Sequence, residues 1–97
     1  MTTLFSPISL RGLRLPNRIV ISPMCQYSAV EGSATDWHMI HLGHLSLSGA
    51  AMMCIEATAV EADGRISPAD LGLYSDDNQQ ALARVLGAVR TYADIAV

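Results

Sequence analysis

A cysteine and a tyrosine, Cys25 and Tyr27, stand two positions apart just after an apolar stretch at 18–22. That stretch is rich in β-branched residues and predicts a strand, which Pro23 ends because proline lacks the N–H that a sheet ladder needs. A thiol can take part in redox chemistry, and a phenol can donate a hydrogen bond to a substrate oxygen. We therefore expect residues 22–27 to face a pocket and to form the floor of a redox site.

The elements that position this segment are typical of one βαβ unit. Thr35 or Asp36 can cap a helix that runs to about Ser48, with Gly49 just past its end. Residues 51–57 form an almost continuous apolar run, as in a strand that is covered on both faces of a parallel sheet. The helix would then join two parallel strands.

Further elements flank this unit. Residues 8–15 alternate around Gly12 and predict a short hairpin. The stretch 60–75 is a long loop with turn signals, and loops of this length are usually functional.

A second helix is predicted after Ser75, with Asn78 at the N3 position in place of the usual Glu or Gln, and it ends near Tyr92. Its apolar positions recur at helical spacing: Leu82, Val85, Leu86 and Val89. Residues 94–97 begin a third strand. The predicted order is hairpin, strand, helix, strand, helix and the start of a strand, an α/β pattern.

Several separated patches resemble the Old Yellow Enzyme family, and they follow the family's order: residues 4–8, 17–19, 22–27, 56–60 and 64–66. The resemblance implies a flavin-dependent ene-reductase on a TIM (β/α)8 barrel. Cys25 and Tyr27 are similar to the branch called thermophilic-like, whereas other branches usually carry Thr at the cysteine position. A barrel of this kind needs about 250 residues. We expect residues 1–97 to be the N-terminal part of a single FMN-binding barrel domain, comprising the hairpin, two βα units and the start of the third strand.

The resemblance also implies roles for individual residues. Ser22, Pro23, Met24 and Cys25 would line a non-covalent FMN, with Ala57 near its ring. The Cys25 thiol would tune the flavin, and Tyr27 would contact the carbonyl of the substrate. Without the resemblance, an ordinary turn after a strand, a small packed cysteine and an amphipathic loop aromatic would explain the same residues.

The activity implied is that of an FMN-dependent NAD(P)H oxidoreductase, an ene-reductase that reduces the C=C bond of α,β-unsaturated carbonyl compounds with NADPH or NADH as hydride donor. One alternative is a related dienoyl-CoA-reductase-like flavin barrel enzyme. Another is a non-catalytic or split-barrel fragment that acts as an assembly partner. The partners would be an enone and either the remainder of the barrel or a complementary chain. We expect the complete enzyme to be a homo-oligomer and the isolated chain to be inactive.

Two groups of polar residues need an explanation in any reading. Glu56 is costly to bury unpaired, so we expect Arg18 or a later residue to pair with it.

Three histidines recur at steps of three within the first helix: His38, His41 and His44. They lack the glutamate of a zincin motif, so a zinc site is not favoured, and we expect His38 and His41 to be polar or half-buried helix residues. Cys54 is expected to pack in its strand, and two reduced thiols are favoured over a disulfide.

Composition excludes several classes of function. The net charge is −3 and the six basic residues are scattered, which gives no footprint for nucleic acid. No apolar run approaches about 20 residues, so no membrane span is predicted, and the first residues do not resemble a secretory signal; we expect a cytoplasmic protein. The hydrophobic content of 51% and the mean hydropathy of +0.30 are high for a small domain. They suggest a surface that further chain covers.

Overall fold

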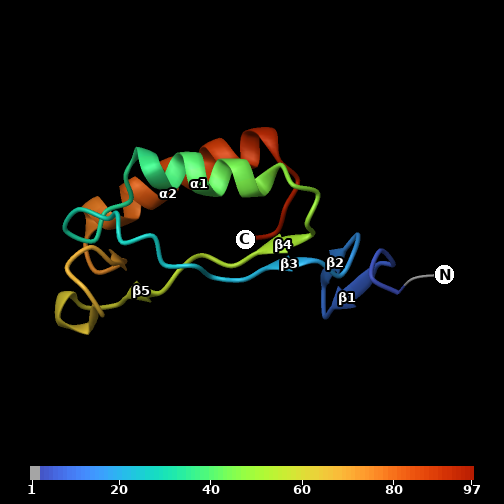
Figure 1. Cartoon of the computed structure of the whole chain (residues 1–97), viewed down its shortest axis with the longest axis horizontal. Coiled ribbons are helices and arrows are strands. Elements are labelled where there is room, and N and C mark those ends of the chain that lie inside the picture. Colours follow the sequence, from blue (N-terminus) through green and yellow to red (C-terminus); the bar gives the residue numbers. More distant parts are fainter. Residues whose placement is uncertain (1–2) are drawn as a thin grey trace.

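Two helices cover one face of a short parallel sheet in the computed structural model, which describes residues 3–97 (Figure 1). Strand β3 (Val20–Ile21) pairs with β4 (Met52–Met53), so that Val20 lies opposite Met52. Backbone hydrogen bonds extend this pairing by one residue at each end, and a parallel bridge from Met52 to Ala96 adds the start of a third strand. The predicted βαβ unit and third strand are confirmed, although the ladders are shorter than the apolar runs.

The helices supply most of the core. Helix α1 (Asp36–Ser46) follows the N-cap residue Thr35, and α2 (Asp76–Tyr92) follows Ser75. The buried core cluster joins both helices to the strands: Leu42, Ala50, Met53, Val85, Val89 and Ile95. Helix α1 ends two residues before the predicted Ser48, and the chain then turns at Gly49, whose φ of +93° is in the region that favours glycine. The second helix has the predicted ends and the predicted inward face.

The other face of the sheet has no cover within residues 3–97. Val20 is 52% exposed and Cys54 is exposed, because side chains alternate along a strand and the helices cover only one side. The prediction that residues 51–57 are covered on both faces is therefore wrong for this part of the chain, and so is the prediction that Cys54 is packed. This three-stranded sheet is open and does not close into a barrel.

The hairpin lies at the end of the molecule opposite to β5 (Figure 1). It consists of β1 (Ile8–Leu10) and β2 (Leu13–Leu15), antiparallel, as predicted. The residue in the left-handed region is Arg11, with φ of 54°, and not the neighbouring Gly12. The hairpin therefore adjoins the amino ends of the sheet strands and leaves their carboxyl ends free.

The segment predicted as one long loop contains structure of its own. Strand β5 (Thr58–Ala59) pairs in parallel with β6 (Leu71–Gly72), and a short 3₁₀ helix, η1 (Ala62–Gly64), lies between them. A buried carboxylate, Asp70, accepts hydrogen bonds from the Ser67 hydroxyl at 2.7 Å and the Ile66 N–H at 3.0 Å. The first of these bonds is the main reason that the pKa of Asp70 is lowered.

Neither helix is long and apolar enough to cross a membrane.

Candidate functional site

Two chain segments leave the sheet side by side at the carboxyl ends of β3 and β4 (Figure 1). Ser22, Pro23 and Met24 follow β3 and are exposed, while Ala57 follows β4 and is also exposed. Parallel pairing brings both ends to one edge of the sheet. The structure thus brings the predicted site residues of the two strands to the same end of the sheet. In enzymes with barrel folds the active site lies at this carboxyl end of the strands.

Cys25 and Tyr27 differ in their exposure and in their backbone. Cys25 is half-buried, whereas the Tyr27 side chain is 62% exposed. The φ of Tyr27 is +51°, in the left-handed region that is uncommon for a bulky residue. Such a conformation costs about 1–3 kcal/mol and persists only where the surroundings hold it. The contacts that hold this residue in place are therefore part of the site.

Gln26, between these two residues, is the centre of those contacts. Its side-chain oxygen accepts a hydrogen bond from the Trp37 indole N–H at 2.9 Å, and its amide donates to the Met24 carbonyl at 2.9 Å. Its own carbonyl accepts from the Ser28 hydroxyl at 2.9 Å. The site loop, residues 24–28, is therefore attached to the first turn of α1.

The backbone of the site loop is also bound to a buried carboxylate. The Gln26 N–H donates to Oε1 of Glu56 at 3.3 Å, and Oε2 of Glu56 lies 3.7 Å from Nε2 of His38. His38 is completely buried and Glu56 is almost so. This contradicts the expectation that His38 is a polar or half-buried helix residue.

The capping geometry fixes which ring nitrogen of the neutral His38 carries the proton. Nδ1 accepts a hydrogen bond from the Thr35 N–H at 2.9 Å, as the Glu of a capping box does. In the neutral ring the proton therefore sits on Nε2, which faces the carboxylate and has no closer polar partner among the described residues. Burial lowers the pKa of His38, and the nearby Glu56 offsets part of that effect.

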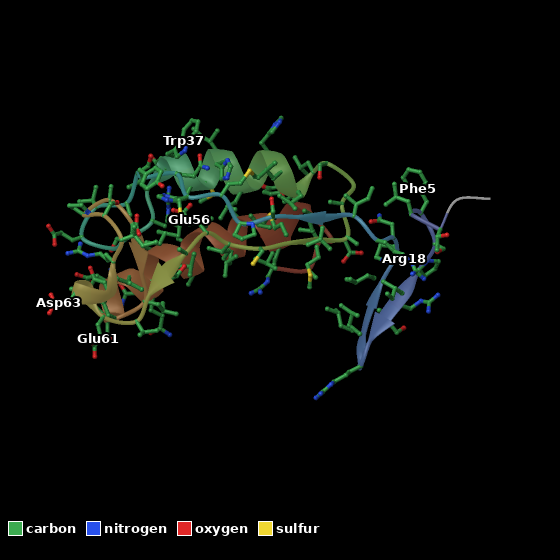
Figure 2. All side chains as sticks on the ribbon, turned by 60° about the horizontal axis from the view of Figure 1, so that its bottom comes forward. Phe5, Arg18, Trp37, Glu56, Glu61 and Asp63 are labelled. Atoms are coloured by element: carbon green, nitrogen blue, oxygen red, sulfur yellow. The ribbon has the colours of Figure 1, made fainter. Side chains whose placement is uncertain are left out.

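Of the two partners expected for Glu56, Arg18 is wrong, and the alternative of a later residue is confirmed by Gln26 and His38. Figure 2 shows Arg18 beside the hairpin, well separated from Glu56 along the length of the molecule. The guanidinium of Arg18 donates to the Pro7 carbonyl at 3.3 Å instead. The reason is topological: Arg18 precedes β3, whereas Glu56 follows β4, so the two residues lie at opposite ends of the parallel pair.

The three histidines do not converge. His38 faces Glu56, His41 stacks on the Trp37 ring at a centroid distance of 6.4 Å, and His44 is exposed. The described residues contain no group of three side chains able to hold a metal ion. Both cysteines are free thiols.

A second polar network supports the neighbouring loop. The buried Asn78 accepts a hydrogen bond from the Tyr74 N–H at 3.3 Å and donates to the Glu31 carbonyl and the Ser33 hydroxyl, each at 3.0 Å. The Ser75 hydroxyl accepts from the Asn78 N–H, which confirms the predicted cap. This network fixes the segment between the site loop and α1.

Sequence reasoning missed three members of the site: Gln26, Trp37 and His38. A signal existed for His38, because it stands three residues after Thr35, where a side chain can accept from the N-cap backbone. Gln26 and Trp37 meet only through tertiary structure.

A candidate site at the carboxyl ends of parallel strands, with helices on one face of the sheet, is typical of α/β barrel folds. The sequence profile of the NADH:flavin oxidoreductase / NADH oxidase family matches residues 3–97, and the chain belongs to this family.

The sequence relatives agree with this assignment. The chain is 48% identical over 84 residues to an NADH:flavin oxidoreductase of Gibberella zeae, which covers 87% of this chain and 20% of that protein. It is 44% identical over 91 residues to the NADPH dehydrogenase of Listeria monocytogenes, covering 92% of this chain and 27% of that protein. The chain thus spans about a fifth to a quarter of the length of these relatives.

Solved structures show the same fold. Morphinone reductase matches with a TM-score of 0.82 and 25% identity, over 91% of this chain and 23% of that chain. The Old Yellow Enzyme homologue of Zymomonas mobilis matches with a TM-score of 0.78 and 24% identity, over 93% and 25% of the two chains. The described residues therefore have the fold of part of a TIM barrel, as predicted.

Proposed function

We propose that this segment belongs to an FMN-dependent NAD(P)H oxidoreductase that reduces the C=C bond of α,β-unsaturated carbonyl compounds. The observation that carries the proposal is that the segment with Cys25 and Tyr27 follows β3 and Ala57 follows β4 at the same end of the parallel pair, in a chain of a flavin oxidoreductase family. We further propose that residues 1–97 form the first part of a single FMN-binding barrel domain.

The residues present fit a flat aromatic cofactor. Ser22, Pro23 and Met24 offer an exposed strand end, and Ala57 opposite them has only a methyl group, so a ring can approach both backbones. Within residues 3–97, the N–H groups of Met24 and Cys25 form no hydrogen bond and are free to donate to a polar ring edge. FMN, when bound, takes a hydride from NAD(P)H and delivers it to the substrate.

Each side chain of the site then has a defined task. The Cys25 thiol donates a weak hydrogen bond toward the flavin and adjusts its potential without anchoring it. The exposed Tyr27 phenol donates to the substrate carbonyl oxygen, where negative charge develops as the β-carbon accepts hydride. The rest of the carbonyl-binding site and the proton donor are expected outside these 97 residues.

The test is to separate the two half-reactions of the full-length enzyme that carries this segment. The purified protein should show a flavin spectrum, NADPH should reduce it without oxygen, and 2-cyclohexenone should reoxidise it to give the saturated ketone. Tyr27→Phe should weaken or slow only the enone step, by about 0.5–3 kcal/mol for one hydrogen bond. Flavin reduction without any enone reduction would contradict the ene-reductase proposal.

Cys25→Ala is the second variant of this test. It should shift the flavin midpoint potential and alter both half-reaction rates while FMN stays bound, because a weak contact tunes and does not anchor. A redox titration measures the shift. An unchanged potential together with unchanged rates would return Cys25 to a packing role.

A second candidate function is that of an assembly partner for a complementary chain. The uncovered sheet face, with Val20 and Cys54 exposed, favours it. In that case the 97-residue chain alone should be colourless and should aggregate or associate, because strand edges and apolar faces remain open. Size-exclusion chromatography with added FMN tests this, and a monodisperse, yellow, active monomer would contradict it.

A further inference from the structure

Glu56 joins the site loop to the core of the molecule. One carboxylate oxygen binds the Gln26 N–H at 3.3 Å and the other faces Nε2 of His38 at 3.7 Å. The peptide group that it holds joins Cys25 to Gln26, one residue before Tyr27, the residue with φ of +51°. In Figure 2 Glu56 lies near Trp37, whose indole binds the Gln26 side chain.

A packing role does not explain a carboxylate at this position. Burying one is costly unless it is paired and hydrogen-bonded, and an apolar side chain would fill the same space without that cost. Glu56 has two partners among residues 3–97, and one of them is the backbone of the site loop. The arrangement makes sense if the carboxylate is needed to hold that loop.

We propose that Glu56, oriented by His38, is a positioning residue that keeps Tyr27 in its left-handed conformation and so presents the phenol to the substrate carbonyl. This inference rests on the proposed function, because it gives the carbonyl-binding role of Tyr27 a structural cause. Cys25 shares the peptide group that Glu56 holds, so the same hydrogen bond also restrains the backbone of Cys25.

His38 sets the direction of the carboxylate. Since Nδ1 is engaged by the Thr35 N–H, Nε2 carries the proton and presents a donor to Oε2 of Glu56. The other oxygen is then directed toward the Gln26 N–H. Replacing Glu56 with Gln places an NH₂ donor where one oxygen was, against either the Nε2–H or the Gln26 N–H, although size and shape are nearly unchanged.

The chain offers a matched control in Asp70. It is also a buried carboxylate that binds a backbone N–H, but it holds the loop between η1 and β6. Asp70→Asn makes the same chemical change as Glu56→Gln without touching the site loop. A general loss of stability would appear in both variants, whereas a positioning effect would appear only in Glu56→Gln.

The first measurement is amide hydrogen exchange of a peptide spanning residues 24–28 in the full-length enzyme. Glu56→Gln should speed its exchange by about tenfold or more, and Asp70→Asn should leave it within about twofold. This readout does not depend on turnover, so it stands even if the enzyme proves not to reduce enones. Unchanged exchange in Glu56→Gln would overturn the inference.

The second measurement is a double-mutant cycle on the enone half-reaction. Glu56→Gln should slow flavin reoxidation by 2-cyclohexenone by about five- to twentyfold, with reduction by NADPH within about twofold. Added to Tyr27→Phe, it should cause little further loss, because its effect passes through Tyr27. Additive losses, or equal slowing of both half-reactions, would show a general structural role and overturn the inference.

His38→Asn is a second variant that tests the same inference if Glu56→Gln does not fold. An Asn at this position can still accept from the Thr35 N–H, as Asn78 accepts at the start of α2, but it no longer reaches Glu56. It should change exchange and enone reoxidation in the same direction as Glu56→Gln, by a smaller factor. Normal exchange and kinetics in this variant would show that His38 does not orient the carboxylate.

Discussion

The first turns of α1 and α2 are both capped by a buried side chain, but the two side chains differ in their chemistry. Each helix has a buried N3 side chain that accepts a backbone N–H at the helix start: His38 accepts from Thr35, and Asn78 accepts from Tyr74. The amide group of Asn78 also donates to the Glu31 carbonyl and to the Ser33 hydroxyl, so all its hydrogen-bonding groups have partners. His38 instead faces a carboxylate at 3.7 Å.

The cap of α2 therefore has only a structural role, whereas the cap of α1 contains a group that can gain or lose a proton. The amide of Asn78 cannot change its charge, so the α2 cap holds its loop equally at any pH. The α1 cap contains an imidazole and faces an acid that holds the site loop. Only the arrangement at α1 can link the protonation of the protein to the position of the Tyr27 side chain.

The largest expected effect comes from breaking the α2 cap. Asn78→Ala leaves the Glu31 carbonyl and the Tyr74 N–H without their partner, and each unsatisfied buried group costs about 1–3 kcal/mol. We expect the full-length enzyme to lose about 2–4 kcal/mol of stability in urea unfolding. Flavin reduction and enone reoxidation of the folded enzyme should stay unchanged. A selective loss of the enone step would erase the contrast between the two caps.

The next prediction concerns pH and the α1 cap. Because the pKa of His38 is lowered by folding from its ordinary value of 6.5, the unfolded state binds a proton more readily than the folded state. Stability should be fully present above pH 6.5 and should be lost as pH falls through the lowered pKa of the folded state. Urea midpoints measured against pH test this. His38→Asn should flatten the curve, and Asn78→Ala should only displace it; an equally steep curve in His38→Asn would assign the slope to another group.

A smaller effect is expected from the indole that holds Gln26. Trp37→Phe keeps the ring but removes the N–H that donates at 2.9 Å, so we expect a loss of about 0.5–1.5 kcal/mol. Since the loop keeps its bond to Glu56, the enone step should slow less than in Glu56→Gln. A greater slowing in Trp37→Phe would make the side chain of Gln26, and not its backbone, the main point of attachment.

The smallest effect is expected from the ion pair between the two helices. Arg84 of α2 donates to Asp36 of α1 at 2.9 Å, but both side chains are more than half exposed. Pairs of this kind contribute about 0–1 kcal/mol because solvent and salt screen them. Arg84→Ala should therefore leave the urea midpoint almost unchanged. A loss comparable to that of Asn78→Ala would mean that the caps depend on how the helices are joined.

Sequence reasoning went furthest where the signals are local. The cap at Ser75 and Asn78, the hairpin at 8–15 and the order of strands and helices all follow from spacing within a few residues, and the structure confirms them. The pairing of β5 with β6 was missed, because a two-residue ladder inside a loop has no periodicity to reveal it. Where the site residues were predicted, the basis was the family resemblance; their roles stay predictions.

The partner of Glu56 required the register of the sheet. Val20 lies opposite Met52, an offset of 32 residues, which places Glu56 level with position 24 and far from Arg18. The apolar runs alone do not give this offset, since sliding one strand by two residues preserves the same pattern. Once the register is known, the site loop is the nearest source of a donor for that carboxylate.

The order of strands has a consequence for how a barrel of this kind is made. β4 has a neighbour on each side, β3 and the bridge to Ala96, whereas β3 pairs only with β4 in this part of the chain. In a closed barrel the free edge of the first strand is paired by the last one. At about 5–20 residues per second, a ribosome needs about ten seconds or more to complete a barrel of about 250 residues. Until that last strand pairs, the strand that leads into Cys25 and Tyr27 keeps an open edge, so the proposed site is enclosed only when the barrel closes.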